Sequence, residues 1–335
     1  MSRGSKHTRN CDNCGDSYTG YGERFCSLIC SGQSKSGALA SGDGVLGITD
    51  EPVLHLPDLG DHHDPDKRWA AAKKTTQQSI EYHEARHTGR LEFDSDKPVG
   101  ISFISDQHVS ESGAVDLERM EADAVLIRET PGLYALLGGD GIDGHIKHWS
   151  AVINNASRPE KELELFDHYL SFFGAKIAGI ISGNHDDWIR DHTSVDVISQ
   201  VAKANKLWYA PDFLQLDLAL PGQSYRIIVR HQYRYESSFN LTHAIKRLWE
   251  MTEDFDVACL GHKHEAALEP FIKHGIVRVG VRPGSYQIVT AHSRRYGWRN
   301  AIPSCPTVIF YPKERHMVGF WDVRDAASYL KYLRS

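Results

Sequence analysis

Apolar runs and amphipathic segments alternate along the chain from residue 98 onward. Short apolar runs predict strands, and apolar side chains recurring at helical spacing predict helices. In the helix predicted over 116–129, one face carries Leu117, Met120, Ala124 and Ile127. The other predicted helices are 160–173 and 195–205, and the predicted strands are 99–105, 133–137, 175–181, 225–229, 257–260, 276–281, 306–311 and 318–323.

This order of elements indicates an α/β (α+β) fold. Strand–helix–strand units come first, and a strand-rich region follows. Two packed sheets with helices on the outside fit that order. Residues 98–335 are therefore expected to form the main domain, and residues 33–97 a linker followed by a segment of helical composition at 67–90.

The first 32 residues are predicted to form a small zinc-binding unit. Its cysteines have the spacing Cys11-x2-Cys14 and Cys26-x3-Cys30. Two such pairs can surround one structural zinc ion, which replaces the core that a short segment lacks. Gly15 is expected to adopt a positive φ in the turn after Cys14. Free thiols or redox cysteines are the alternative.

Composition narrows the class of protein. Hydrophobic residues make up 41% and charged residues 24% of the 335 residues, as in soluble globular proteins. No apolar run is long enough to span a bilayer, and no apolar stretch follows the basic N-terminus, so a cytoplasmic protein is expected. The net charge of -6 argues against unspecific coating of duplex nucleic acid.

Five short motifs, each behind a predicted strand, carry the candidate chemistry. They are Asp106-Gln-His108, Gly139-Asp140-Gly-Ile-Asp143, Gly183-Asn184-His185-Asp186, His231 and Gly261-His262-Lys-His264. Because sites in α/β folds form at the carboxyl ends of strands, these side chains are expected to converge. Their oxygen and nitrogen atoms suit two divalent transition metals, with Mn expected and Fe, Zn, Ni or Co as alternatives.

The ordered set of motifs resembles the calcineurin-like metallophosphoesterase superfamily over about residues 98–325. The resemblance implies a four-layer β-sandwich flanked by helices, with a dinuclear metal site at one edge. It also implies a hydroxide between the metals that attacks phosphorus in line. The arrangement is further similar to phage-encoded and SbcD-type phosphoesterases, which would place the chain in the host cytoplasm.

The resemblance also implies a role for each residue of the motifs. Asp106, His108 and His264 would hold one metal, Asn184, His231 and His262 the other, and Asp140 would bridge them. His185 would act on the phosphate, Asp186 would orient His185, and Asp143 would orient a ligand histidine. No motif surrounds His231, but it follows a predicted strand and lies between the Asn184 and His262 motifs, where the family has a ligand histidine.

Two stretches outside the motifs favour nucleic acid as the substrate, and DNA hydrolysis is the leading hypothesis. One is the segment after His231, which contains Arg234. The other is basic and aromatic, a combination that can hold a phosphate backbone and stack bases. Its candidate contacts are Arg294, Arg295, Tyr296, Trp298 and Arg299. The alternative for each stretch is a solvated loop whose aromatic side chains pack in the core.

Two other functions remain open at the level of sequence. One is a phosphomonoesterase or a phosphodiesterase of small nucleotides. The second is a binding scaffold that keeps the fold without catalysis, against which the complete ligand set argues. Nothing in the sequence predicts the oligomeric state.

Overall fold

The computed structural model describes residues 7–12, 14–20, 24, 65–144, 158–251, 254–273, 275–288 and 302–335. Internal contacts divide the chain into two compact units, Met1–Arg68 and Trp69–Ser335. Each unit is described by itself below.

The N-terminal unit contains an antiparallel hairpin. Strand β1 (His7–Asn10) pairs with β2 (Ser17–Gly20). The turn between them begins at the buried Cys11, whose carbonyl accepts a 2.9 Å hydrogen bond from the N–H of Gly15. Gly15 has the expected positive φ of 78°. Cys14 is exposed, and Cys26 and Cys30 lie outside the described residues, so zinc binding stays a prediction.

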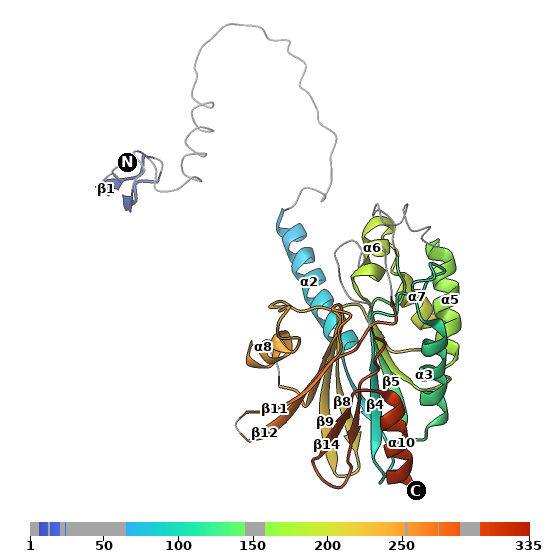
Figure 1. Cartoon of the computed structure of the whole chain (residues 1–335). Coiled ribbons are helices and arrows are strands. Elements are labelled where there is room, and N and C mark those ends of the chain that lie inside the picture. Colours follow the sequence, from blue (N-terminus) through green and yellow to red (C-terminus); the bar gives the residue numbers. More distant parts are fainter. Residues whose placement is uncertain are drawn as a thin grey trace. The chain divides into compact units, whose positions relative to one another are not determined.

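Two six-stranded mixed sheets form the centre of the larger unit (Figure 1). The first sheet has the order β11-β12-β10-β9-β8-β3, and the second has the order β14-β13-β4-β5-β6-β7. The strands of the first sheet are β3 (Thr88–Glu92), β8 (Phe213–Leu220), β9 (Gln223–Arg230), β10 (Val257–Leu260), β11 (Ala267–Lys273) and β12 (Ile276–Arg282). Those of the second are β4 (Val99–Ile104), β5 (Leu133–Gly138), β6 (Ile177–Ile181), β7 (Tyr209–Ala210), β13 (Thr307–Phe310) and β14 (Met317–Phe320).

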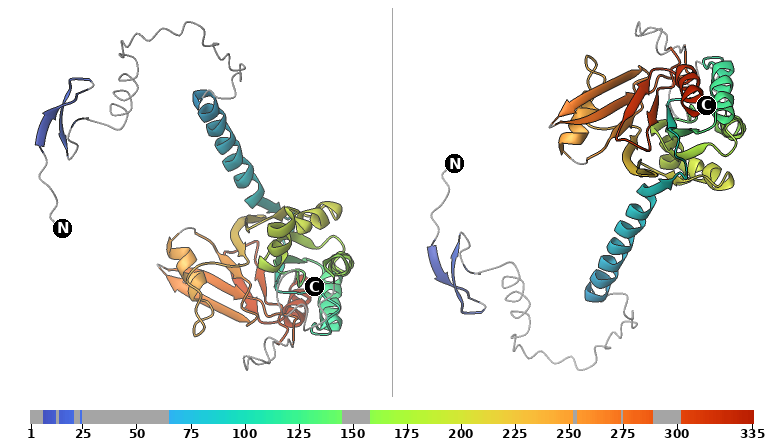
Figure 2. Two further views of the ribbon diagram at one scale, coloured as in Figure 1. Left: turned by 90° about the horizontal axis from the view of Figure 1, so that it is seen from above. Right: turned by 90° about the horizontal axis from the view of Figure 1, so that it is seen from below.

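Helices cover the outer faces of both sheets, as Figures 1 and 2 show. The described residues form the helices α2 (Pro65–His87), α3 (Leu117–Glu129), α5 (Pro159–Ser171), α6 (Asn184–Thr193), α7 (Val197–Ala204), α8 (His243–Met251) and α10 (Val323–Arg334), of which α2 is exposed over residues 65–81. Helices α3, α5, α7 and α10 pack on the second sheet, and α8 packs on the first. The predicted α/β sandwich of two sheets flanked by helices is thus confirmed.

The apolar layer between the sheets explains why strand β4 is buried along its whole length. Ile101 and Phe103 contribute to this layer together with Leu216, Ile227 and other side chains of the first sheet. The opposite face of β4 meets helix α10, where Gly100 lies close to Leu330. A strand covered on both faces reads as a continuous apolar run, which is why the sequence predicted it well.

The structure differs from the predicted elements at several places. The segment expected to be helical over 67–90 changes at Thr88 into β3, which pairs with β8 in parallel and joins the main sheet ahead of residue 98. The strand predicted at 318–323 ends at Phe320, and α10 begins at Val323. No helix among the described residues is long and apolar enough to cross a bilayer.

Replacement of Phe103 by alanine tests the layer between the sheets. Phe103 is fully buried, so we expect Phe103→Ala to lower the free energy of unfolding by about 3–5 kcal/mol in a urea titration. Phe239→Ala is the matched control, because the Phe239 ring is fully exposed and its removal should change stability by less than about 0.5 kcal/mol. Equal losses in the two variants would contradict this packing.

Candidate metal centre

All five motifs lie where strands of the two sheets end. Asp106 and His108 follow β4, Asp140 follows β5, and Asn184 follows β6. These three strands are parallel neighbours in the second sheet. His231 follows β9 and His262 follows β10, which are parallel neighbours in the first sheet. The carboxyl ends of both sheets therefore face one site, as the positions of the motifs predicted.

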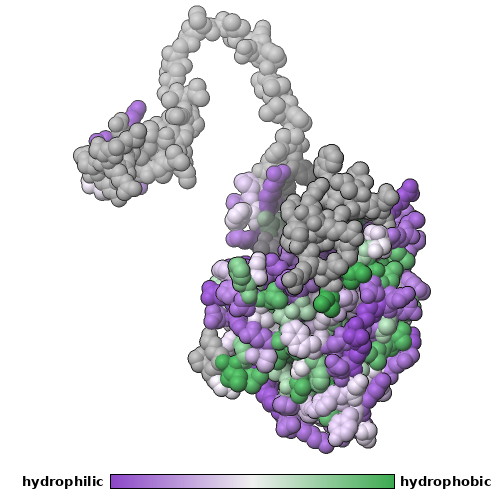
Figure 3. Space-filling model, in the orientation of Figure 1, coloured by the Kyte–Doolittle hydropathy of each residue, from purple (hydrophilic) through white to green (hydrophobic). Residues whose placement is uncertain are grey.

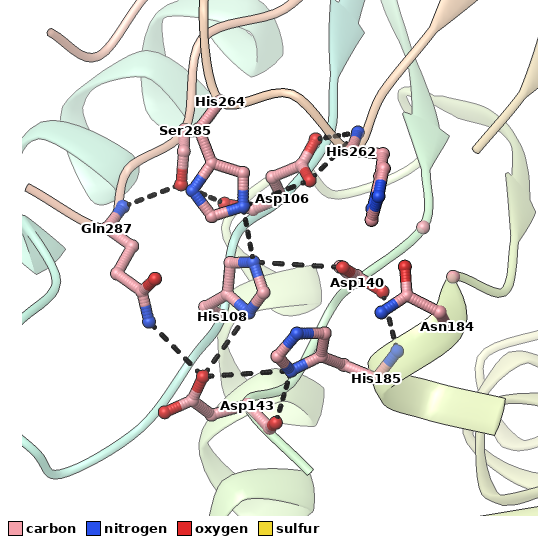
Figure 4. A network of polar contacts seen from close by, with 12 residues as sticks. Asp106, His108, Asp140, Asp143, Asn184, His185, His262, His264, Ser285 and Gln287 are labelled. Carbon is pink, nitrogen blue, oxygen red and sulfur yellow. Dashed lines mark hydrogen bonds and ion pairs between the residues drawn. The ribbon is translucent and has the colours of Figure 1, made fainter. Parts of the chain in front are cut away.

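The side chains converge in groups that could hold cations. One group is Asp106, His108 and His264, and another is Asp140, His231 and His262. In each group the ligand atoms lie within 4.8 Å of one another. A third group of His108, Asp143 and His185 adjoins the first. Figure 4 shows the labelled members of these groups around a common centre: Asp106, His108, Asp140, Asp143, His185, His262 and His264.

The distances between ligand atoms fit metal coordination. Ligand atoms about 2.1 Å from an ion lie about 3.0 Å apart in octahedral and about 3.4 Å apart in tetrahedral geometry. In the first group, His264 Nε2 lies 3.0 Å from His108 Nε2 and 3.4 Å from Asp106 Oδ1. In the second, His231 Nε2 lies 3.1 Å from Asp140 Oδ2 and 3.2 Å from Asn184 Oδ1.

Asp140 lies between the two groups. Its Oδ1 accepts a 2.9 Å hydrogen bond from the backbone N–H of His185, at the start of α6. Its Oδ2 is 3.1 Å from His231 Nε2 and 3.8 Å from His108 Nε2. One carboxylate oxygen thus faces a histidine of each group, which is the arrangement that a bridging ligand requires.

Most of the candidate ligands have an unusual backbone. Positive φ values between 48° and 73° occur at Asp106, His108, Asp140, His262 and His264. This region is unfavourable for residues with a Cβ atom and is found at functional sites that the surrounding structure stabilises. Hydrogen bonds hold Asp106 at both its side chain and its backbone. Its carboxylate oxygens accept from the backbone N–H of His262 at 2.9 and 3.0 Å, and its carbonyl accepts from the Ser285 hydroxyl at 2.7 Å.

Asp143 contacts two histidines of the site. Its Oδ1 is 3.3 Å from Nδ1 of His108, which leaves Nε2 of His108 for a metal. Its backbone carbonyl is 2.6 Å from Nδ1 of His185. Since a carbonyl can only accept, Nδ1 of His185 carries the proton in this pair. Asp143 therefore lies against the Nδ1 atoms of both histidines, and its predicted role of orienting a ligand histidine stays a prediction.

The prediction that Asp186 orients His185 through its side chain is wrong. The Asp186 carboxylate is buried and accepts hydrogen bonds from the backbone N–H groups of Gly183, Gly141 and Ile142 at 2.8 to 3.3 Å. It thereby caps the first turn of α6. Asp186 therefore positions His185 through the backbone of the helix, and the imidazole is oriented by Asp143.

Three polar residues of the site were missed in the sequence. The amide of Gln232 donates to Oδ1 of Asn184 and lies 3.1 Å from Nδ1 of His262. Gln287 donates to Asp143 Oδ1 at 3.2 Å, and Ser285 donates to the Asp106 carbonyl. Gln232 directly follows the candidate ligand His231, which is the signal that could have found it. Ser285 and Gln287 had no such signal.

Burial and neighbouring charges alter the pKa values of the site. Burial lowers the pKa of His108 and His231, but the carboxylates beside them outweigh it and raise these values to about 9 and about 10. Burial and the Asp140 charge raise the pKa of Asp186 to about 7. Burial and the charge of His108 lower the pKa of His185 to about 4, so this imidazole is neutral at pH 7.

The predicted substrate contacts are only partly placed. Arg234 is exposed on the loop after β9, with its guanidinium 5.8 Å from the centre of the Tyr233 ring. The other predicted contacts lie outside the described residues. They are Arg294, Arg295, Tyr296, Trp298 and Arg299.

Comparisons with known proteins find distant structural similarity. No protein-family model and no curated protein matches the sequence. A predicted phosphoesterase from Streptococcus pneumoniae is 16% identical, with 68% of this chain and 99% of that chain covered and a TM-score of 0.33. A metallophosphoesterase from Sphaerobacter thermophilus is 15% identical, with 70% and 95% covered and a TM-score of 0.32.

A third similar structure is Vps29 from Entamoeba histolytica in complex with Zn²⁺. It is 14% identical, with 66% of this chain and 98% of that chain covered and a TM-score of 0.33. At such identities and TM-scores the function has to be inferred from the site of this chain itself.

Substitution of Gly183 tests the close backbone approach around Asp140. A Cβ atom on Gly183 would lie 2.1 Å from Asp140 Oδ1, so the carboxylate would have to move. We expect Gly183→Ala to weaken Mn²⁺ binding at least tenfold in calorimetry, since displaced partners of metal ligands typically cost about 10–100-fold. Gly280→Ala is the control, because its Cβ would meet Ile245 at an ordinary 3.4 Å. Unchanged affinity in Gly183→Ala would contradict the proposed site.

Metal binding is expected to release protons. With pKa values of about 9 and about 10, His108 and His231 carry protons at pH 7 in the metal-free protein, whereas a metal needs the neutral ring. Mn²⁺ affinity should therefore fall as the pH is lowered, and up to about two protons should be released at pH 7. Calorimetry in buffers of different ionisation enthalpy measures this number. No proton release at pH 7 would contradict the assignment of these two ligands.

Proposed function

We propose that this chain is a metal-dependent phosphodiesterase that acts on nucleic acid, with DNA as the expected substrate. The observation that carries the proposal is the position of Asp140 Oδ2 between two groups of ligands, each with histidine nitrogens and carboxylate or amide oxygens at coordination distances. The ordered motifs support it, because they resemble those of metallophosphoesterases. Manganese fits the mixed nitrogen and oxygen donors, and the four N-terminal cysteines are proposed to hold a structural zinc ion.

The ligand roles follow from the groups. Asp106, His108 and His264 would hold one cation, and Asp140 would share it with the second. Asn184, His231 and His262 would complete the second site. Two bound cations would polarise the phosphate ester and lower the pKa of a bound water, so that hydrolysis proceeds at neutral pH.

The chain's own groups orient the site and move the proton. Asp143 holds His108 through Nδ1 and holds His185 through the carbonyl contact at 2.6 Å. His185 is thereby fixed with Nε2 as the atom that would contact the ester. The Nε2 atom of the neutral ring accepts a hydrogen bond or a proton, and the protonated ring can pass that proton to the leaving oxygen. Trp188 packs on the His185 ring at 4.0 Å and limits its rotation.

Hydrolysis of a synthetic diester tests the reaction class. Purified protein with Mn²⁺ is expected to hydrolyse bis-p-nitrophenyl phosphate, and Asp140→Asn should lower kcat more than about 100-fold, because even outer partners of metal ligands contribute 10–100-fold. Asp94→Asn is the control, since Asp94 is exposed and precedes the start of β4, whereas Asp106 follows the other end of that strand. Absence of turnover with each of Mn, Fe, Zn, Ni and Co would refute the proposal.

A panel of substrates separates the proposed function from its alternative. Single-stranded DNA, duplex ends, cyclic nucleotides and p-nitrophenyl phosphate would be compared under the same metal conditions. A preference for polynucleotides supports a nuclease. A preference for p-nitrophenyl phosphate or cyclic nucleotides would favour the phosphomonoesterase or small-nucleotide reading.

A further inference from the structure

The loop between β9 and α8 presents exposed aromatic rings next to the metal centre. This loop, residues 233–240, follows the candidate ligand His231 and the site residue Gln232. Phe239 is fully exposed, and Tyr235 is 43% exposed. The face seen in Figure 3 intersperses hydrophobic with hydrophilic residues. These exposed rings offer faces that a ligand beside the candidate metal centre can contact.

Arginine side chains alternate with the tyrosines of this loop. The Arg234 guanidinium lies 5.8 Å from the centre of the Tyr233 ring and 5.3 Å from that of Tyr235. Arg247, on α8, lies 5.2 Å from the same Tyr235 ring. The Tyr235 ring thus lies near two guanidinium groups, one from the loop and one from α8. The backbone of the loop is bent at Tyr235, whose φ is 69°.

A buried arginine fixes the 233–240 loop to the metal centre. Arg282 is almost fully buried at the end of β12. It donates to the Glu236 carboxylate within the loop and to the Leu241 carbonyl directly after it. It also donates to the carbonyl of Gly261 at 2.8 Å, next to the candidate ligand His262. One side chain therefore ties both the middle and the end of the loop to the segment that carries His262 and His264.

The charges around the loop favour an anionic ligand. Among the described residues, Arg234 forms no ion pair with a carboxylate, and Lys263 stands between the two histidines of the last motif. Arg247 forms an ion pair with Glu250 at 3.0 Å, and Glu236 forms one with Arg282. Glu265 is the acid that remains beside His264. The loop therefore combines the unpaired cation Arg234 with exposed aromatic rings, and Arg247 of α8 adds a second positive charge beside it.

We propose that the 233–240 loop is the platform on which single-stranded nucleic acid binds beside the metal centre. Bases would stack on Phe239 and Tyr235, and Arg234 and Arg247 would contact the phosphates between them. Paired bases in a duplex cannot offer their faces to these rings, so the platform selects single strands. The inference rests on the proposed function, because it places the substrate of that same site.

Binding of oligonucleotides tests the platform without depending on turnover. The full chain with Mn²⁺ would be titrated into fluorescein-labelled dT20 with a phosphorothioate backbone, which resists cleavage, and anisotropy would be recorded. Phe239→Ala and Tyr235→Ala should each weaken binding at least about fivefold, as expected for the loss of one stacked base. Phe239→Trp should retain binding, because the larger ring still stacks. Tyr332→Ala, which removes an exposed ring on α10, is the matched control.

The arginines predict a different readout. Arg234→Ala should weaken binding and lower the slope of log affinity against log salt by about 0.7, because one phosphate contact is lost. Arg128→Ala, on the exposed side of α3, should leave the slope unchanged. If the variants lose as much affinity for rU20 as for dT20, the platform binds single strands of either sugar. If they lose less affinity for rU20, the platform is specific for DNA.

Several results would overturn the platform. An affinity for dT20 that is unchanged in Phe239→Ala and Tyr235→Ala contradicts it. So does a result in which these two variants lose more affinity for duplex DNA than for dT20. A wild-type dimer that becomes a monomer in Phe239→Ala would show that the loop is a contact between copies of the chain. If wild-type protein binds dT20 as predicted but hydrolyses no diester, the proposed reaction fails while the platform stands.

Discussion

Several buried charges and imidazoles converge on the Asp140 carboxylate, and this convergence constrains the rest of the structure. Asp140 lies 3.1 Å from His231 and 3.8 Å from His108, with Asp106 and Asp143 close by. Burying such groups is costly unless each charge is compensated. Without metal, protons on His108 and His231 provide the compensation, and their raised pKa values express it. Two cations would compensate the same carboxylates while the imidazoles become neutral ligands.

The fold stabilises the backbone that this convergence requires. Candidate ligands with positive φ follow the last residues of β4, β5 and β10, so the strained residues lie directly after rigid strands. A Cβ atom on Gly261 would come within 2.1 Å of the Ser105 hydroxyl, which shows how closely the loops of the two sheets approach. Packing between the sheets, to which Phe103 contributes, therefore sets the distances between the ligands that the two sheets supply to each group.

The sequence predicted the continuous apolar strands better than the elements that bury only one face. Strands such as β4 and β10 are continuous apolar runs, and their following motifs are distinct. Strand β8 was missed although Phe213 to Leu220 alternate in polarity, and α8 was missed although Ala244, Ile245 and Leu248 lie on one face. Helix α6 offered little pattern, because its first turn is the metal motif itself. The predicted contact of Asp186 with the His185 ring was wrong, because sequence spacing does not show which backbone N–H groups lie within hydrogen-bonding distance of a carboxylate.

Electron paramagnetic resonance of the Mn²⁺-loaded protein tests the central claim most directly. If Asp140 joins two sites, the spectrum should be that of two exchange-coupled Mn²⁺ ions, and Asp140→Asn should convert it to the spectrum of isolated ions. Asp94→Asn should leave the coupled spectrum unchanged. A wild-type protein that shows only isolated Mn²⁺ at two equivalents of metal would contradict a shared carboxylate between the two groups of ligands.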